Sequence, residues 1–303
     1  MKESKKIELS EVEPQVAIES VSDESNELWI NPIGGLGDTL MLSGVLKLVY
    51  DRDPSKRFNL ARRTRYSSIL DGHPAIGKVG HPPKDAKIIG TDYWSHEALG
   101  PGTQRAFQIL ARMYGLPTPI EEKLYLPVEP EDDPILYKFI PWKEKNVLIS
   151  PSSESPRKMM HPMAWHIIVE KLKEQGANVM QSGRMNELRI KGAYSLLGIT
   201  SPRQLIALMR KCQLVVTSDN FVMHAAHLTG IPTVAFWGPT DHRVYGYEEQ
   251  THLQAPLDHC DQKDACIGVG FAQNYPTPCP LGEHHCMNRI PMEEILYKIS
   301  QRL

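Results

Sequence analysis

The sequence lacks both a surplus of one charge and long apolar runs. Its 303 residues carry a formal net charge of −2, which gives no support for a general nucleic-acid binder, because such proteins usually carry a basic surplus. No apolar run reaches the roughly 18 residues that span a bilayer. With 41% hydrophobic and 23% charged residues, we expect a soluble globular protein, and this length is comfortable for two domains.

The N-terminal segment lacks the apolar core of a secretory signal. Residues 1–26 are rich in Glu, Ser and Lys, a composition that predicts a disordered arm. The five cysteines are an odd number, and without a signal this favours a reducing compartment. We therefore expect a cytoplasmic protein.

Three familiar motifs are absent. The glycines of GGLGD (34–38) do not complete G-x-G-x-x-G, because position 40 is Leu, and no Lys-Ser/Thr pair follows as in a P-loop. His224 and His227 lie three residues apart without the H-E-x-x-H pattern of zinc proteases. Any phosphate or sugar chemistry must use a different arrangement.

Strand and helix patterns alternate in two cycles. The first begins at ELWI (27–30) and the second at NVLISP (146–151), with a Pro-rich, acidic stretch at 116–134 between them. Such alternation indicates parallel sheets flanked by helices. We expect an α/β fold of two Rossmann-like domains facing each other across a cleft, 27–140 and 141–303, with the last helix a candidate to pack back on the first domain.

Polar loops follow several predicted strands: GGLGD (34–38), SSESPRK (152–158), SGRMNE (182–187), TSDN (217–220) and GPTD (238–241). In parallel sheets ligands bind at the carboxyl ends of strands. These loops are therefore expected to gather in the cleft.

Asp38 admits two interpretations. It stands where a helix begins, so it could simply cap that helix, and the motif alone favours this reading. It could also face a substrate, since glycines allow close approach and helix N-termini favour anions.

The stretch 217–241 concentrates small polar residues at a helix start. Ser218, Asp219 and Asn220 precede one predicted helix, and Gly238, Pro239 and Thr240 follow the next predicted strand. With free helix N–H groups, they could cradle a diphosphate without metal. The alternative for His224 and His227 is that they are ordinary interior or surface residues.

This stretch resembles the donor-site signature of glycosyltransferase family 9, the lipopolysaccharide heptosyltransferases. The signature D-[ST]-G-x-x-H-x-A-A followed by G-P-T-[DE] stands here as D-N-F-V-M-H-A-A-H and G-P-T-D. GGLGD, residues 165–187 and residues 279–296 resemble further family segments in the same order. The resemblance covers most of residues 28–300.

The resemblance implies the GT-B fold and an inverting, metal-independent transfer of heptose from ADP-heptose to a lipopolysaccharide-type or other glycan acceptor. Asp38 matches the family's general base. Lys158, with Arg157 close behind, would stabilise the departing diphosphate. Glu187 matches a nucleoside contact and His224 the signature histidine near the phosphates. The other donor-side candidates are Ser218, Asp219, Asn220, Gly238, Pro239 and Thr240, and the acceptor-side loop candidates are Gly34, Gly35 and Gly37.

One departure from the signature supports a rival hypothesis. Asn220 and Phe221 replace Ser/Thr-Gly, which removes a glycine's conformational freedom and narrows the loop. The rival is a non-catalytic GT-B-fold protein that binds a nucleotide or glycan in a glycan-assembly complex. For the enzyme, the expected partners are a nucleotide-sugar and a glycan or glycolipid, with contact at the inner membrane face through the basic segment 56–65 as a further hypothesis.

Four of the five cysteines fall close together, at Cys260, Cys266, Cys279 and Cys286. Their spacing is looser than the C-x-x-C pairs of zinc sites. Two interpretations remain open, a structural zinc or iron site and four reduced thiols. Some relatives of the resembled family hold iron in a cysteine cluster of different spacing.

Overall fold

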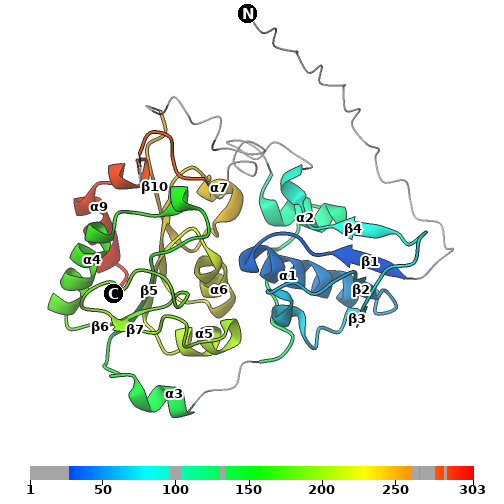
Figure 1. The fold of residues 1–303 in the computed structure, drawn as a ribbon, viewed down its shortest axis with the longest axis horizontal. Helices are drawn as coiled ribbons and strands as arrows, with labels where there is room; N and C mark the ends of the chain where they lie inside the picture. The colour runs from blue at the N-terminus through cyan, green and yellow to red at the C-terminus, as the bar shows by residue number, and fades with distance from the viewer. Residues whose placement is uncertain are drawn as a thin grey trace, which may run out of the picture.

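The computed structural model describes residues 27–95, 104–129, 134–258, 260, 266, 277–282 and 285–303. The predicted N-terminal arm lies outside these residues. Two parallel β-sheets with their helices form two lobes that lie side by side (Figure 1). None of the described helices combines the length and apolar composition that crossing a bilayer requires.

The first lobe contains a four-stranded sheet in the order β3-β2-β1-β4, with every pair parallel. The long helix α1 covers the sheet and joins its hydrophobic core through Leu42 and Val45. The elements of this lobe are β1 (Leu28–Asn31), α1 (Leu36–Arg52), β2 (Phe58–Leu60), η1 (Ser67–Leu70), β3 (Ile76–Val79), β4 (Ile88–Gly90), η2 (Tyr93–Ser95) and α2 (Ala106–Met113).

The second lobe contains a six-stranded parallel sheet in the order β10-β9-β8-β5-β6-β7. Its central strands are buried along their whole length, which explains their continuous apolar sequence. The strands are β5 (Asn146–Ser150), β6 (Asn178–Gln181), β7 (Tyr194–Ser195), β8 (Leu214–Ser218), β9 (Thr233–Trp237) and β10 (Thr251–Gln254). The helices of this part of the chain are α3 (Pro134–Phe139), η3 (Pro156–Lys158), α4 (Pro162–Glu174), α5 (Pro202–Met209), α6 (Phe221–Thr229), α7 (His242–Tyr245), η5 (Met287–Arg289) and α9 (Met292–Ser300).

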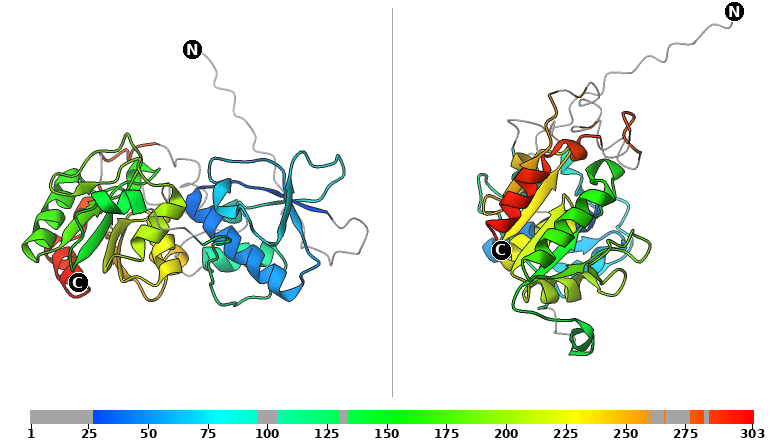
Figure 2. Two further views of the ribbon diagram at one scale, coloured as in Figure 1. Left: turned by 90° about the horizontal axis from the view of Figure 1, so that it is seen from below. Right: turned by 90° about the vertical axis from the view of Figure 1, so that its left-hand side faces the viewer.

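Helices cover both faces of the second sheet. On one face α4 and α9 lie side by side (Figure 2, right), and Ile295 and Ile299 of α9 share a hydrophobic core with Trp165 of α4. The last helix thus packs on its own lobe, and not back on the first domain as the sequence had suggested. On the other face lie α5 and α6.

The lobes share a hydrophobic core. Leu40 of α1 and Ile69 of η1 belong to the same buried cluster as Leu205 of α5 and Val222 of α6. Helices α1 and α6 therefore pack against each other between the two sheets (Figure 1). The α/β class and the two facing Rossmann-like lobes agree with the sequence prediction.

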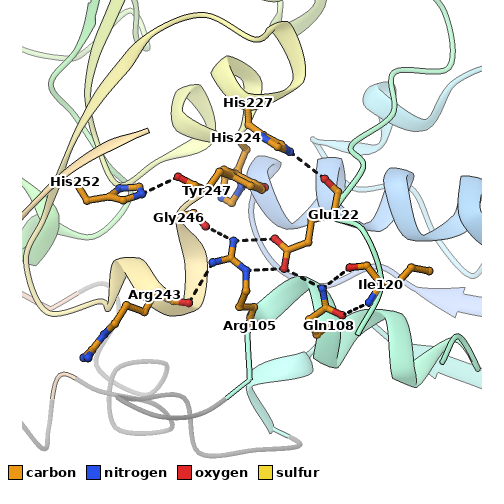
Figure 3. Close-up of polar contacts among 10 residues, drawn as sticks. All are labelled: Arg105, Gln108, Ile120, Glu122, His224, His227, Arg243, Gly246, Tyr247 and His252. Atoms are coloured by element: carbon orange, nitrogen blue, oxygen red, sulfur yellow. Dashed lines mark hydrogen bonds and ion pairs between the residues drawn. The ribbon is translucent and has the colours of Figure 1, made fainter. Parts of the chain in front are cut away.

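Two arginines also cross between the lobes. Arg203 of α5 donates to the carbonyl oxygens of Ser68, Asp71 and Val128 at 2.6–3.1 Å. Arg105, just before α2, donates to the carbonyl oxygen of Gly246 (Figure 3). These contacts fix the geometry of the space between the lobes.

Candidate active site between the lobes

A pocket of about 280 Å³ lies between the lobes. From the first lobe it is lined by the loop that opens α1, together with Tyr66 and Tyr93. From the second lobe it is lined by the loops after β5, β6 and β8 and by the start of α6. The predicted gathering of the loops that follow these strands is therefore confirmed for four of them, while the GPTD loop lies outside the pocket lining.

Asp38 is the third residue of α1, whose N-cap is Gly35, and it also lines the pocket. Its Oδ2 accepts the backbone N–H of Gly35 at 2.6 Å, and its Oδ1 accepts the hydroxyl of Tyr93 at 2.6 Å. Burial raises the pKa of Asp38, and the hydrogen bonds from Tyr93 and Gly35 partly oppose that rise. Asp38 is therefore not the N-cap that the sequence suggested, but its hydrogen bond to Gly35 stabilises the start of α1, and this role is compatible with a place in the pocket.

At two positions of this loop, neighbouring side chains lie too close for any residue larger than glycine. Gly34 has φ +103°, and a Cβ there would lie 2.6 Å from Oδ2 of Asp38. A Cβ on Gly37 would lie 2.6 Å from Cδ2 of His224. The sharp turn therefore seats Asp38 and lets the imidazole of the opposite lobe approach α1.

A buried ion pair stands on the second-lobe side. Nζ of Lys158 lies 2.7 Å from Oδ2 of Asp219, and these side chains are only 12% and 6% exposed. Thr240 donates its hydroxyl to the same carboxylate oxygen. This pairing holds the ammonium of Lys158 at the pocket wall, where both it and Asp219 are within electrostatic range of Asp38.

The Asn220-Phe221 departure causes no backbone strain. Asn220 is extended, with φ −158°, and its Oδ1 accepts the N–H of Val222 at 2.8 Å as the cap of α6. Its Nδ2 donates to the carbonyl oxygens of Ser150 and Ser152. Phe221 is the first helical residue and lines the pocket. No glycine is needed at these positions, so what the departure changes is the wall of the pocket.

Glu187 carries a polar atom without a protein partner. Its Oε1 accepts Nε of Arg184 at 3.1 Å. Its Oε2 is buried, and no hydrogen-bond partner for it exists within the described parts of the chain. A buried acceptor of this kind at a pocket wall would be satisfied by a ligand hydroxyl.

Glu154 lines the pocket, has partners from both lobes and was not singled out from the sequence. Arg65 and Tyr66 of the first lobe both donate to its Oε1, and Nη1 of Arg184 lies 3.6 Å away. The polar loop 152–158 was the only sequence signal for Glu154. Tyr66 and Tyr93 carried none, because only the fold brings them to the pocket.

His224 and His227 have different environments. The ring of His224 lines the pocket, and its Nδ1 lies 2.8 Å from the hydroxyl of Tyr247. Burial lowers its pKa to about 4, so the imidazole is neutral near pH 7. His227 stacks on Tyr247 with ring centroids 3.7 Å apart and bonds the backbone carbonyl of Glu122 (Figure 3).

Several predicted donor residues lie outside the pocket lining. Ser218 donates to the carbonyl of Pro151, Gly238 lies against Met287, and Thr240 acts only through Asp219. Gly34 also lies behind the lining. The predicted residues that line the pocket are Gly35, Gly37, Asp38, Lys158, Glu187, Asp219, Asn220 and His224.

Arg157 and Pro239 instead line a second, small cavity of about 20 Å³ with Cys260, Cys266, Cys279, His285 and Cys286. Arg157 donates to Sγ of Cys266 at 2.9 Å and to the hydroxyl of Thr277 at 2.8 Å. The sequence had placed Arg157 in the donor site. The structure corrects this prediction, because these hydrogen bonds hold the guanidinium in the small cavity and away from the large pocket.

The cysteine cavity has the donor chemistry of a zinc or iron site. Yet among the His, Cys, Asp and Glu residues within the described ranges, no three are arranged to hold an ion. Burial and the neighbouring thiols raise the pKa of Cys286 to about 12, which keeps it protonated. In the structure the cavity is lined by the four thiols and by Arg157, whose guanidinium contacts Cys266.

A family model described as glycosyltransferase family 9 (heptosyltransferase) matches residues 94–259. No curated protein matches the chain.

Solved structures show the same fold at low sequence identity. A family 9 glycosyltransferase from Veillonella parvula is 13% identical, with a TM-score of 0.66 over 93% of this chain and 98% of that one. The iron-containing dodecameric glycosyltransferase TibC from enterotoxigenic E. coli is 16% identical, with a TM-score of 0.68 over 91% of this chain and 75% of that one. The E. coli heptosyltransferase WaaC with ADP is 12% identical, with a TM-score of 0.61 over 91% and 100%. The fold is GT-B, as predicted.

Proposed function

The chain belongs to glycosyltransferase family 9, and on that premise we propose that it transfers a heptose from ADP-heptose to a glycan or glycolipid acceptor, with inversion and without a catalytic metal ion. The observation that carries this proposal is that Asp38 of one lobe and the Lys158–Asp219 pair of the other line the same pocket. In a displacement reaction, a base on one wall can take the proton of the attacking hydroxyl, and a cation on the opposite wall can stabilise the leaving group.

In the proposed reaction Asp38 acts as the general base. The acceptor hydroxyl loses its proton to the Asp38 carboxylate while its oxygen forms a bond to the anomeric carbon. The bond from that carbon to the phosphate oxygen breaks, and its electron pair leaves with the nucleoside diphosphate. The raised pKa of Asp38 makes it a stronger base than an exposed carboxylate.

Lys158 and the start of α6 are the proposed stabilisers of the leaving diphosphate. The ammonium is held by Asp219 at the pocket wall, so it needs no reorganisation as negative charge develops. The N-terminus of α6 adds the favourable end of a helix dipole. These groups support a reaction in which protein charges stabilise the leaving group.

ADP-heptose is proposed as the donor on two grounds. TibC has been solved with ADP-D-β-D-heptose and WaaC with ADP. In this chain the unpartnered Oε2 of Glu187 suits a ribose hydroxyl. The acceptor is proposed more broadly, as a glycan or glycolipid. The exposed basic residues Lys56, Arg57 and Arg62 could face an anionic surface, whereas Arg63 and Arg65 already pair with Asp71 and Glu154.

For the cysteine cavity, a structural zinc or iron ion remains a proposal. Four thiols and one imidazole around a single cavity support it. Against it, no three of these side chains are close enough together, within the described residues, to hold an ion. Elemental analysis of the purified protein, alongside a variant with all four cysteines replaced by Ser, tests it. Equal metal content in the two proteins would remove the proposal.

The experiment that tests the main proposal is calorimetric titration with ADP, GDP, UDP and ADP-heptose in the presence of EDTA. Selective binding of ADP and ADP-heptose is expected, followed by ADP release when acceptor extracts are added. Binding of another nucleotide would replace the donor. Absence of nucleotide binding by a folded sample would instead favour the non-catalytic binding protein, with Phe221 as the first residue to revert to Gly.

A further inference from the structure

His224 presents one ring nitrogen to the pocket and the other to a buried phenol. Its Nδ1 lies 2.8 Å from the hydroxyl of Tyr247. Its Nε2 makes no hydrogen bond within the described parts of the chain and faces the pocket next to Gly37. What the imidazole offers a ligand therefore depends on which nitrogen carries the proton.

The surroundings of Tyr247 decide this point. Tyr247 is 3% exposed, and Nδ1 of His224 is the sole hydrogen-bond partner of its hydroxyl among the described residues. A phenol can donate its proton only to an acceptor, and a protonated Nδ1 would leave that O–H buried without a partner. The O–H of Tyr247 therefore donates to an unprotonated Nδ1, which leaves the proton of the neutral ring on Nε2.

Tyr247 is itself held firmly. His227 stacks on its ring with an interplanar angle of 3°. Nε2 of His227 bonds the carbonyl of Glu122 at 3.0 Å, and Arg105 holds the carboxylate of Glu122 at 2.6 and 2.8 Å (Figure 3). The carbonyl of Tyr247 is bonded by His252 at 2.9 Å. The phenol is thus fixed by residues of both lobes and of the segment that connects them.

We propose that Tyr247 is a positioning residue that fixes His224 as the Nε2–H tautomer, so that the pocket presents an N–H donor to an oxygen of the sugar diphosphate. This inference rests on the proposed function for the identity of the ligand, but not for the tautomer. The low pKa of His224 agrees with it, because the ring enters the pocket neutral and acts as a directed donor, not as a second cation beside Lys158.

The tautomer is measured first, in the wild-type protein without ligand. Long-range ¹H–¹⁵N correlation spectra of ¹⁵N-histidine-labelled protein, assigned with His224→Ala, distinguish protonated from unprotonated ring nitrogens. A proton on Nε2 at pH 7 is expected. A proton on Nδ1 would overturn the proposal, and this measurement needs no variant of Tyr247 to fold.

The second measurement uses ADP as the probe. Tyr247→Phe keeps the ring that stacks on His227 and removes only the hydroxyl, so the fold should survive. We expect the Kd for ADP to rise about three- to tenfold, the scale of one hydrogen bond. Tyr297→Phe, on the exposed side of α9, is the matched control and should leave the Kd unchanged.

A double-mutant cycle separates positioning from a merely structural effect. In a His224→Ala background, Tyr247→Phe should have no further effect on ADP binding, because no imidazole remains to be oriented. An equal loss in both backgrounds would overturn the proposal. If the wild-type protein binds no ADP, the proposed function fails, and the tautomer measurement alone decides this inference.

Discussion

Arg157 and Lys158 are consecutive residues of one 3₁₀ helix, yet they line two cavities of different kind. Lys158 lines the large pocket between the lobes, where Asp219 orients it. Arg157 lines the small cysteine cavity and donates to a thiol and a loop. The two cavities share no lining residue. One step along the chain thus separates a charge at the wall of the large pocket from a charge that holds the loop at Thr277 and Pro278.

The comparison shows how similar residues acquire different roles. Both side chains are cationic and largely buried, so composition cannot distinguish them. The difference lies in the partners, since a carboxylate keeps an ammonium in place whereas several neutral acceptors enclose a guanidinium. The large pocket should therefore respond to substitution through binding and rate, and the small cavity through stability.

The largest expected effect is on the pocket side, at Asp38. Asp38→Asn should lower the rate of ADP release from ADP-heptose about 10²- to 10⁴-fold, because an amide cannot take the proton. The Kd for ADP should change less than about twofold, and the Asn oxygen can still accept the N–H of Gly35. Transfer at the parent rate would remove Asp38 from the proposed mechanism.

The comparison is tested directly by truncating the two neighbours. Lys158→Ala should raise the Kd for ADP roughly 10- to 100-fold, because it removes a charged hydrogen-bond donor and leaves the negative charge of Asp219 in the pocket without a cation beside it. Arg157→Ala should change that Kd less than about threefold but lower the free energy of unfolding by roughly 2–3 kcal/mol. Calorimetry and urea unfolding measure the two quantities on both variants.

A loss of ADP affinity in Arg157→Ala would contradict the separation of the two cavities. If Arg157→Ala weakens ADP binding as much as Lys158→Ala does at equal stability, then both cations act on the ligand. In that case the conformation with ligand bound must differ from the one described.

A smaller effect is expected at Tyr93, which donates to Asp38 at 2.6 Å. That hydrogen bond lowers the pKa of Asp38, so its removal in Tyr93→Phe should raise the pKa. Since the ionised carboxylate is the proposed base, activity should fall away at a higher pH on the acid side than in the parent. The pH–rate profile of ADP release measures the shift, and an unmoved acid limb would contradict it.

The smallest effect is expected in the cysteine cavity. Cys286→Ser should leave ADP affinity unchanged within about twofold, because the cavity is separate from the pocket. In the folded parent, the pKa of about 12 should make Cys286 react slowly with iodoacetamide at pH 8 and readily after unfolding. Peptide mass spectrometry follows the modification, and fast reaction of the native thiol would contradict the prediction.

The second lobe was the more predictable part of the fold. Its central strands β5, β8 and β9 are buried along their whole length and end in polar loops, and its helices carry local signals, such as Ser201 and Pro202 at the start of α5 and Gly230 at the end of α6. In the first lobe the strands are short, and β2 has only the three residues Phe58–Leu60. The edge strand β10 and the two-residue β7 were not predicted, because edge positions leave them partly exposed and without a strong pattern.

The site was predictable wherever a motif carried it. Asp38, Asp219 and His224 stand in recognisable segments and line the pocket. Tyr93, which also lines the pocket, and Tyr247 stand in no recognisable motif, because each reaches its partner from more than 20 residues away in the chain. The sequence favoured Lys158 over Arg157 only narrowly, because the direction in which each side chain leaves the short helix η3 cannot be read from the sequence.

The hydrophobic cluster that joins α1 to α5 and α6 has a consequence for the exchange of parts between related enzymes. Since Leu40 and Ile69 complete a core that belongs mostly to the other lobe, the halves are not interchangeable modules. A chimaera that imports a foreign first lobe to change the acceptor would leave Leu205 and Val222 facing a mismatched surface. Recombination could succeed only if the imported α1 and η1 carried complementary shapes, so the interface restricts which halves can be combined.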